Sequence, residues 1–242
     1  MSIIKFRDKK IHHVHIPRCA GKFIANLMIA HRIEVLQFEV QHWPPHSEFT
    51  TFELEDESCL QFQWEAHKGV RIKTAHKEIY QSMEEFDNCT HRFAVIRDPY
   101  QRFISALGMI CCSPSNDYDL HKVLDLIKTK EGFDKFMHLA RTKFAYEENS
   151  LRPQHEFLVG DELIWRFEDG FGENFADWFK ENFDIPLVLE SHGESVVDIL
   201  QIESSDIGYL KREEEMKTAK IPESLEGFVK EYYAKDYELL DY

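Results

Sequence analysis

The chain has 242 residues, of which 43% are hydrophobic and 13% aromatic, enough for one large α/β domain or two small ones with a sizeable core. Its formal net charge of -15 argues against general binding to nucleic acids or anionic membranes, so an anionic ligand requires a local cluster of Arg and Lys. No apolar stretch approaches the roughly 18 residues of a membrane span, and no signal peptide is recognisable. Since two of the five cysteines are the neighbours Cys111 and Cys112, which bridge poorly, we expect a reduced, cytoplasmic protein.

Strand-like and helix-like segments alternate along the chain. Three stretches have the apolar character of buried strands: residues 10–16, 91–98 and 161–169. Each is followed by a stretch with helical spacing: residues 24–34, 99–110 and 172–183. The last segment, residues 223–240, also repeats its apolar residues at helical intervals. Such strand-loop-helix units predict a parallel sheet with helices on both faces, whose ligand lies beyond the carboxyl ends of the strands.

Residues 37–64 interrupt this alternation with paired prolines, scattered aromatic and acidic residues, and weak periodicity. We interpret the segment as an excursion from a single domain that spans residues 1–242. This segment could form part of an acceptor pocket, or it could be a plain surface insertion, and both interpretations stay open.

The loop after the first predicted strand combines two basic residues with a glycine. It reads "PRCAGKF" and places Arg18, Gly21 and Lys22 directly before a predicted helix. Backbone N–H groups at the start of a helix, together with the positive end of its dipole, bind phosphate or sulfate. Arg18 and Lys22 add full charges, so the loop predicts an anion site. An ordinary helix start with two solvated basic residues is the alternative.

Two common phosphate loops are excluded because their side chains are missing. A Walker A loop needs a glycine at position 16, which is Ile16, and Ser or Thr at position 23, which is Phe23, to bind magnesium. A phosphatase loop built on Cys19 needs an arginine at position 25, which is Ala25. What remains is an anion cradle without a metal ligand.

A second anion site is predicted at the end of the 91–98 strand. Arg97 lies at this end, Asp98 and Pro99 suit the start of the next helix, and Ser105 lies within that helix. An arginine fork binds phosphate through two hydrogen bonds, and a serine hydroxyl adds a donor. The alternatives are an ion pair of Arg97 with Asp98 and a Ser105 hydroxyl bonded to its own helix. Two anion-binding strand ends indicate a ligand with two separated anionic groups, such as a nucleotide phosphorylated at its 5′ and 3′ positions.

Five segments, in order from residue 11 to residue 242, resemble motifs of the sulfotransferases that act on carbohydrates. They are "HIPRCAGKFI", "FAVIRDPYQRFISAL", "LRPQHEFL", "WRFED" and "YYAKDYELLDY". The resemblance implies 3′-phosphoadenylyl sulfate as donor, a sulfuryl group moved to a hydroxyl of a saccharide, and no metal. It also implies a three-layer α/β/α fold with a central parallel sheet of P-loop type.

The resemblance assigns roles to particular residues. The 5′-phosphosulfate loop corresponds to Arg18, Cys19, Ala20, Gly21, Lys22 and Phe23. Arg18 stands where the family usually has a lysine that contacts the bridging oxygen and the sulfate. Arg97 and Ser105 stand at the 3′-phosphate positions. Lys22 and Phe23 depart from the family pattern, which has a hydroxyl residue and a small polar residue there.

Sulfuryl transfer requires in-line attack by the acceptor oxygen while charge builds on the leaving phosphate. Arg18 would stabilise that charge, but it is no proton donor because the pKa of arginine lies above ~12. Histidine is the usual general base near neutral pH. His76 is the first candidate, since its segment resembles the one that often carries the base in this family, and a helix-start histidine is the alternative. His155 is the second candidate.

Two rival functions stay open. A P-loop-like kinase needs a magnesium site that the sequence does not offer, and a non-catalytic nucleotide-binding relative is kept open by Lys22 and Phe23. The histidines at positions 12, 13 and 15 do not predict a metal centre, because only His13 and His15 share a face of the strand. Buried, hydrogen-bonded strand histidines are the favoured interpretation.

Overall fold

The computed structural model describes residues 2–30, 34–43, 46–52, 89–111, 119–143, 150–187, 215–216 and 218–242. The chain divides into two compact units. The first unit comprises Met1–Arg97 and Pro153–Val188, and the second comprises Asp98–Arg152 and Leu189–Tyr242. The single domain over residues 1–242 stays a prediction.

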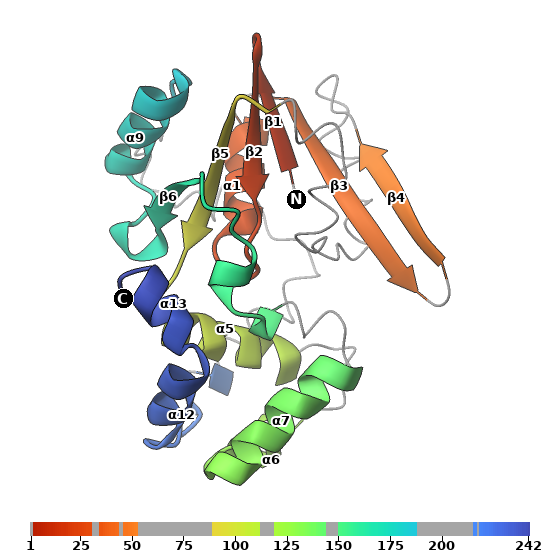
Figure 1. Ribbon diagram of the computed structural model, residues 1–242, viewed down its shortest axis with the longest axis vertical. Helices are drawn as coiled ribbons and strands as arrows, with labels where there is room; N and C mark the ends of the chain where they lie inside the picture. The colour runs from red at the N-terminus through yellow and green to blue at the C-terminus, as the bar shows by residue number, and fades with distance from the viewer. Residues whose placement is uncertain are drawn as a thin grey trace. The chain divides into compact units, whose positions relative to one another are not determined.

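The first unit contains a six-stranded sheet with the order β4-β3-β1-β2-β5-β6 (Figure 1). Its strands are β1 (Ser2–Phe6), β2 (Lys9–Val14), β3 (Glu34–Trp43), β4 (His46–Phe52), β5 (His91–Ile96) and β6 (Leu163–Arg166). The three strands predicted from the sequence are β2, β5 and β6, and they pair in parallel as expected. The fold is therefore mixed α/β.

The rest of the sheet corrects the expectation of a purely parallel sheet. Strand β1 pairs antiparallel with β2 and with β3, and β3 pairs antiparallel with β4. Only two residues separate β1 from β2 and β3 from β4, and connections this short join only antiparallel strands. Strands β3 and β4 cover much of the segment 37–64, whose remaining residues from 53 onward lie outside the described part.

The parallel strands bring their carboxyl ends to one edge of the sheet. His13 of β2 pairs with Phe93 of β5, and Phe93 pairs with Leu163 of β6. Residues 93–96 of β5 are at most 1% exposed, which explains why this strand is apolar on both faces. The segments that follow Val14 and Ile96 therefore leave the sheet on the same side.

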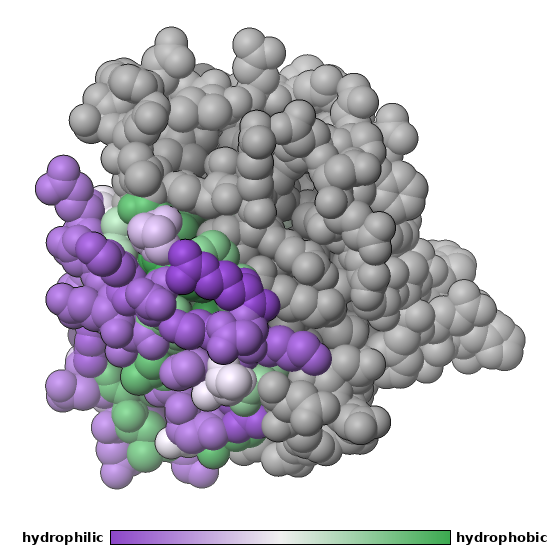
Figure 2. Space-filling view, turned by 90° about the horizontal axis from the view of Figure 1, so that it is seen from above, coloured by the Kyte–Doolittle hydropathy of each residue, from purple (hydrophilic) through white to green (hydrophobic). Residues whose placement is uncertain are grey.

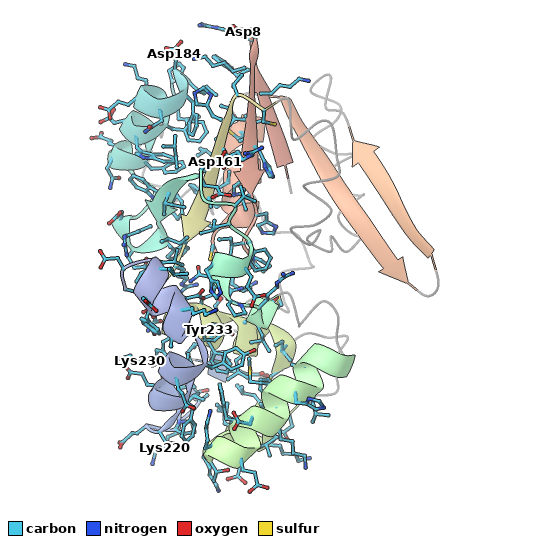
Figure 3. All side chains as sticks on the ribbon, viewed as in Figure 1. Asp8, Asp161, Asp184, Lys220, Lys230 and Tyr233 are labelled. Atoms are coloured by element: carbon cyan, nitrogen blue, oxygen red, sulfur yellow. The ribbon has the colours of Figure 1, made fainter. Side chains whose placement is uncertain are left out.

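Two described helices follow parallel strands of this unit: α1 (Gly21–Ala30) after β2 and α9 (Glu173–Phe183) after β6. Helix α9 buries three phenylalanines against the sheet, and the rings of Phe179 and Phe183 lie 5.4 and 5.5 Å from that of Phe93. Helix α9 ends at Asp184, which has a left-handed backbone and lies near the tip of the helix in Figure 3. The Lys9 ammonium donates to the Phe183 carbonyl oxygen at 2.8 Å and fixes this end.

The described part of the second unit is helical. Its helices are α5 (Pro99–Cys111), α6 (Leu120–Leu126), α7 (Lys130–Lys143), α12 (Leu225–Tyr232) and α13 (Ala234–Leu239). The Asp98 carboxylate accepts the Gln101 N–H at 2.7 Å, so Asp98 caps α5 as predicted, with Pro99 in the first turn. Phe103, Phe133 and Val229 belong to one buried cluster that joins these helices.

A buried tyrosine ties the last helices to the middle of the chain. The predicted helix over 223–240 is divided at Tyr233, whose ring is 1% exposed and which Figure 3 shows at this junction. Its hydroxyl donates to the Leu151 carbonyl oxygen at 2.5 Å. The break in the helix therefore coincides with an anchor between residues 82 positions apart.

Hydrophilic side chains dominate the coloured face of the molecule in Figure 2. The outward residues of α9 are polar and exposed: Glu173, Asp177, Lys180 and Glu181. Among the residues that the structure describes, no helix is both long enough and apolar enough to span a membrane.

Candidate donor site

The loop between β2 and α1 has an unusual backbone. Arg18 and Ala20 have positive φ angles of 70° and 62°, a conformation that costs about 1–2 kcal/mol for a residue other than glycine. Cys19 lies between them, and its N–H closes a turn onto the Ile16 carbonyl oxygen at 3.2 Å. Alternation of left-handed and ordinary residues is a backbone pattern that builds concave anion sites in proteins.

The residue before α1, Ala20, offers no side-chain acceptor for the first turn of the helix. The Ile24 N–H makes the first helical bond, to the Ala20 carbonyl oxygen at 3.0 Å, and alanine at the N-cap carries no acceptor. Helices α5 and α6 differ, because Asp98 and Asp119 accept N–H groups of their first turns. The first N–H groups of α1 therefore suit an external anion.

His15 packs directly on the first residue of α1. A Cβ atom placed on Gly21 would lie 2.1 Å from the His15 Nε2, a separation that two non-bonded side-chain atoms never reach. Only glycine therefore fits at position 21 while His15 keeps its place. The requirement comes from this close approach, since Gly21 has no positive φ angle.

Phe23 turns its side chain toward other aromatic residues. Its ring lies 4.6 Å from that of Phe171, which follows β6, and Phe171 lies 5.6 Å from Phe167. The Phe23 ring is therefore part of an aromatic group with Phe167 and Phe171. The side chain of Lys22 lies outside the described part, and Arg18 is half-buried.

Arg97 lies at the carboxyl end of β5, and one of its side-chain donors makes no hydrogen bond. Its guanidinium carbon lies 4.4 Å from the centre of the Phe167 ring, a cation–π contact that fixes its direction. Its Nε is buried and has no hydrogen-bond partner. No described acidic side chain of this unit pairs with Arg97. A buried donor without a partner is expensive, and a bound anion would satisfy it.

Gln154 connects the loop to Arg97. Its Oε1 accepts the Arg97 N–H at 3.0 Å and the Cys19 Sγ–H at 3.4 Å, and its Nε2 donates to the Arg97 carbonyl oxygen at 2.7 Å. Gln154 lies in the short 3-10 helix η1 (Gln154–Glu156) and is 0% exposed. The Cys19 thiol is thus engaged in the interior, and the Cys19 N–H is engaged by the Ile16 carbonyl oxygen.

The structure places the other predicted residues as follows. Ser105 lies in α5 of the second unit and is half-buried, and His155 is half-buried beside Gln154. His76 lies outside the described residues. The structure thus brings the loop 18–23 and Arg97 to one edge of the first unit.

Of the three histidines, His12 and His13 are buried, as the sequence favoured, whereas His15 is half-buried. His12 and His13 are 3% and 2% exposed, and the His13 ring stacks on Phe93 with centroids 4.8 Å apart. Burial lowers the pKa of His12 to about 2 and the pKa of His13 to about 3. Both rings are therefore neutral core side chains at neutral pH. In the described ranges, no group of His, Cys, Asp and Glu side chains forms a candidate metal site.

A cavity of about 240 Å³ lies at the opposite, amino-terminal ends of β5 and β6, where His91 and Leu163 help to line it. Its charged residues, Arg92 and Asp161, already pair with each other at 2.6 Å, and Figure 3 labels Asp161. This cavity therefore offers less to an anion than the loop at the other edge.

A match to a family model gives the class of the protein. The family, described as "Sulfotransferase family", matches residues 2–242, so the chain belongs to this family and is a sulfotransferase. The match confirms the resemblance found in the motifs. No significant match was found among curated proteins or among solved structures.

Sequence reasoning missed three residues of this edge: Gln154, Phe167 and Phe171. Gln154 belongs to the "LRPQHEFL" segment, but no periodicity marks a glutamine as buried, and only the three-dimensional structure shows its partners. The aromatic character of Phe167 and Phe171 was visible. Their contacts with Arg97 and Phe23 depend on the turn that follows β6 and carried no local signal.

Proposed function

We propose that this sulfotransferase moves the sulfuryl group of 3′-phosphoadenylyl sulfate to a hydroxyl group of a carbohydrate. The buried Nε of Arg97 carries the proposal, because an arginine that is oriented by Phe167 and whose Nε lacks a partner suits a phosphate. The strained, uncapped loop at residues 18–23 supports a second anion site at the same sheet edge. We further propose that the parallel strands belong to a three-layer sheet of P-loop type.

The donor would be held through both of its anionic groups. The first N–H groups of α1 and the loop residues 18–23 would bind the 5′-phosphosulfate. Arg97 and Ser105 would bind the 3′-phosphate, which distinguishes this nucleotide from an ordinary adenosine 5′-phosphate. The chemistry of these residues fits the donor, because all are N–H, guanidinium or hydroxyl donors.

In the transfer step, the acceptor oxygen forms a bond to sulfur while the bond from sulfur to the bridging oxygen breaks. The acceptor proton passes to a general base, for which we propose His76, and the products are a sulfate ester and adenosine 3′,5′-bisphosphate. Arg18 would stabilise the negative charge that grows on the leaving phosphate oxygen. Localisation in the cytoplasm stays a prediction.

Calorimetric titration in the presence of a chelator tests the donor assignment. Adenosine 3′,5′-bisphosphate is expected to bind without added metal and at least tenfold more tightly than adenosine 5′-phosphate, since a charge-assisted contact contributes ~1.5–3 kcal/mol. The Arg97→Ala variant should lose this advantage and bind the monophosphate almost normally. Equal affinities of the unaltered protein for the two nucleotides would refute the 3′-phosphate assignment.

Turnover with sulfate-labelled donor tests the reaction and the acceptor. Saccharides with free hydroxyl groups should become labelled in chelator, whereas matched saccharides without those hydroxyls should not. Labelling of other alcohols but of no saccharide would overturn the carbohydrate assignment. Nucleotide binding with no transfer to any acceptor would favour the non-catalytic alternative, and magnesium-dependent transfer of phosphate from ATP would favour the kinase.

A further inference from the structure

Gln154 binds the end of β5 as a neighbouring strand would. It exchanges one donated and one accepted hydrogen bond with the backbone of a single residue, Arg97, the pairing that two strands make in a sheet. Strand β5 ends at Ile96, so the side-chain amide continues the pairing one residue beyond the strand. The backbone from which the Arg97 guanidinium extends is thereby fixed.

The same amide oxygen also contacts the other anion-binding segment. Cys19 lies between Arg18 and Ala20, the two residues with positive φ angles, and its thiol donates to the Gln154 Oε1 at 3.4 Å. Cys19 is 1% exposed and Gln154 is 0% exposed, so water does not substitute for either partner. One buried side chain therefore links the loop to Arg97, beyond the pairing of β2 with β5.

We propose that Gln154 is a positioning residue that sets the spacing between the 5′-phosphosulfate loop and Arg97, and so determines the preference for a nucleotide phosphorylated at both ends. The inference rests on the proposed function. Gln154 itself touches no donor in this scheme. It acts through the backbone of Arg97 and through Cys19, and the spacing matters because phosphate contacts are lost over shifts of about 1 Å.

Only a side chain of this length that both donates and accepts a hydrogen bond satisfies the geometry. A carboxylate accepts hydrogen bonds but does not donate to the Arg97 carbonyl oxygen, whereas a protonated carboxyl group does both. Leucine has a similar volume and does neither. The Gln154→Glu and Gln154→Leu variants therefore separate hydrogen bonding from volume, and pH separates the two forms of the glutamate.

The experiment measures the ratio of affinities for adenosine 3′,5′-bisphosphate and adenosine 5′-phosphate by calorimetry, at several pH values, relative to the unaltered protein at the same pH. Gln154→Leu should lower this ratio by about tenfold at every pH, the size of one charge-assisted contact. Gln154→Glu should keep a nearly normal ratio at low pH, where the buried carboxyl group is protonated, and lose it as the pH rises.

Asn182→Ala is the matched control. The Asn182 Nδ2 donates to the Trp178 carbonyl oxygen at 2.8 Å within α9. The variant therefore removes a hydrogen bond made by a side-chain amide in the first unit, in a helix that does not contain the loop. It should lower thermal stability and leave the affinity ratio unchanged. A merely structural Gln154 would behave in the same way.

The outcomes discriminate between the possibilities. If folded Gln154→Leu keeps the normal ratio, the positioning role is wrong, and a loss in Gln154→Glu alone would then indicate charge repulsion. If Gln154→Leu does not fold, the pH dependence of the ratio in Gln154→Glu decides, and a ratio that does not change with pH overturns the proposal. If the unaltered protein binds both nucleotides equally, the proposed function fails instead.

Discussion

At the scale of single residues, the contact between His15 and Gly21 constrains the loop before α1. Gly21→Ala should weaken binding of adenosine 3′,5′-bisphosphate and destabilise the protein by about 1–3 kcal/mol, the usual cost of overpacking, because the new methyl group would overlap the His15 ring. Calorimetry and chemical denaturation measure the two effects.

The double variant His15→Ala/Gly21→Ala provides the control. Removal of the imidazole makes room for the methyl group, so the double variant should be more stable than Gly21→Ala alone. Additive losses would show that the glycine is required for a reason other than His15.

Arg18 should matter more for the reaction than for binding. In the proposed function, its contact strengthens as charge grows on the leaving oxygen, and only such contacts raise the rate. Arg18→Ala should therefore lower the single-turnover rate by about 100-fold or more while it weakens the bisphosphate far less. Arg18→Lys should recover part of the rate. Equal losses in affinity and rate would make Arg18 a simple binding residue.

At the scale of elements, α7 illustrates a conflict between helix propensity and packing. Alanine is a better helix former than glycine by about 1 kcal/mol, but a Cβ on Gly132 would lie 1.8 Å from the Leu126 carbonyl oxygen. Backbone cannot move aside as a side chain can, so the overlap outweighs the propensity. Gly132→Ala should lower the midpoint of thermal unfolding.

Gly227 in α12 is the matched control for this substitution. Apart from its chain neighbours and the backbone of its own helix, no described atom lies within 4 Å of the Cβ position at Gly227, and the residue is exposed. Gly227→Ala should therefore benefit from the higher helix propensity of alanine and stabilise the protein by up to about 1 kcal/mol. Opposite shifts of the two melting temperatures are expected, and a stabilising Gly132→Ala would contradict the close approach of α7 to the Leu126 carbonyl group.

The sequence predicted the elements better than their arrangement. Strands β2, β5 and β6 and helices α5 and α9 were recognisable because periodicity, caps and apolar runs are local signals. The antiparallel half of the sheet was missed. The pairing of β1 with β3 joins distant residues and left no periodic mark, whereas β1–β2 and β3–β4 are local hairpins that were overlooked in the sequence. For the candidate site, the loop at 18–23 and Arg97 were predicted from their motifs, whereas Gln154 was not, since its partners meet only in the folded chain.

At the scale of the whole molecule, the two buried histidines make stability depend on pH. Burial lowers the pKa of His12 to about 2 and the pKa of His13 to about 3, whereas an unfolded histidine has a pKa of about 6.5. The unfolded chain therefore binds more protons below this value. The free energy of unfolding should fall as the pH drops below about 6.5, with a limiting slope near 1.4 kcal/mol per pH unit for each histidine.

Chemical denaturation between about pH 5 and 8 measures this dependence, because this range brackets the histidine pKa of about 6.5. His13→Gln removes one titrating ring, so its unfolding free energy should depend less steeply on pH even if its absolute stability is lower. An unchanged slope in this variant would show that His13 is not the group that titrates on unfolding.

The hydrogen bond between Arg97 and Gln154 also bears on which segments of this chain can be exchanged during evolution. The chain leaves the first unit after Arg97 and re-enters it at Pro153, and a hydrogen bond of 3.0 Å joins Arg97 to the residue that follows Pro153. Residues 98–152 thus form an insertion whose two ends meet, the kind of join at which protein segments are exchanged with least disturbance. An exchange of this segment would have to include residues 189–242, because Phe103, Phe133 and Leu151 share one buried core with Leu225, Val229 and Tyr233, whereas the parallel strands and the loop at residues 18–23 would stay as they are.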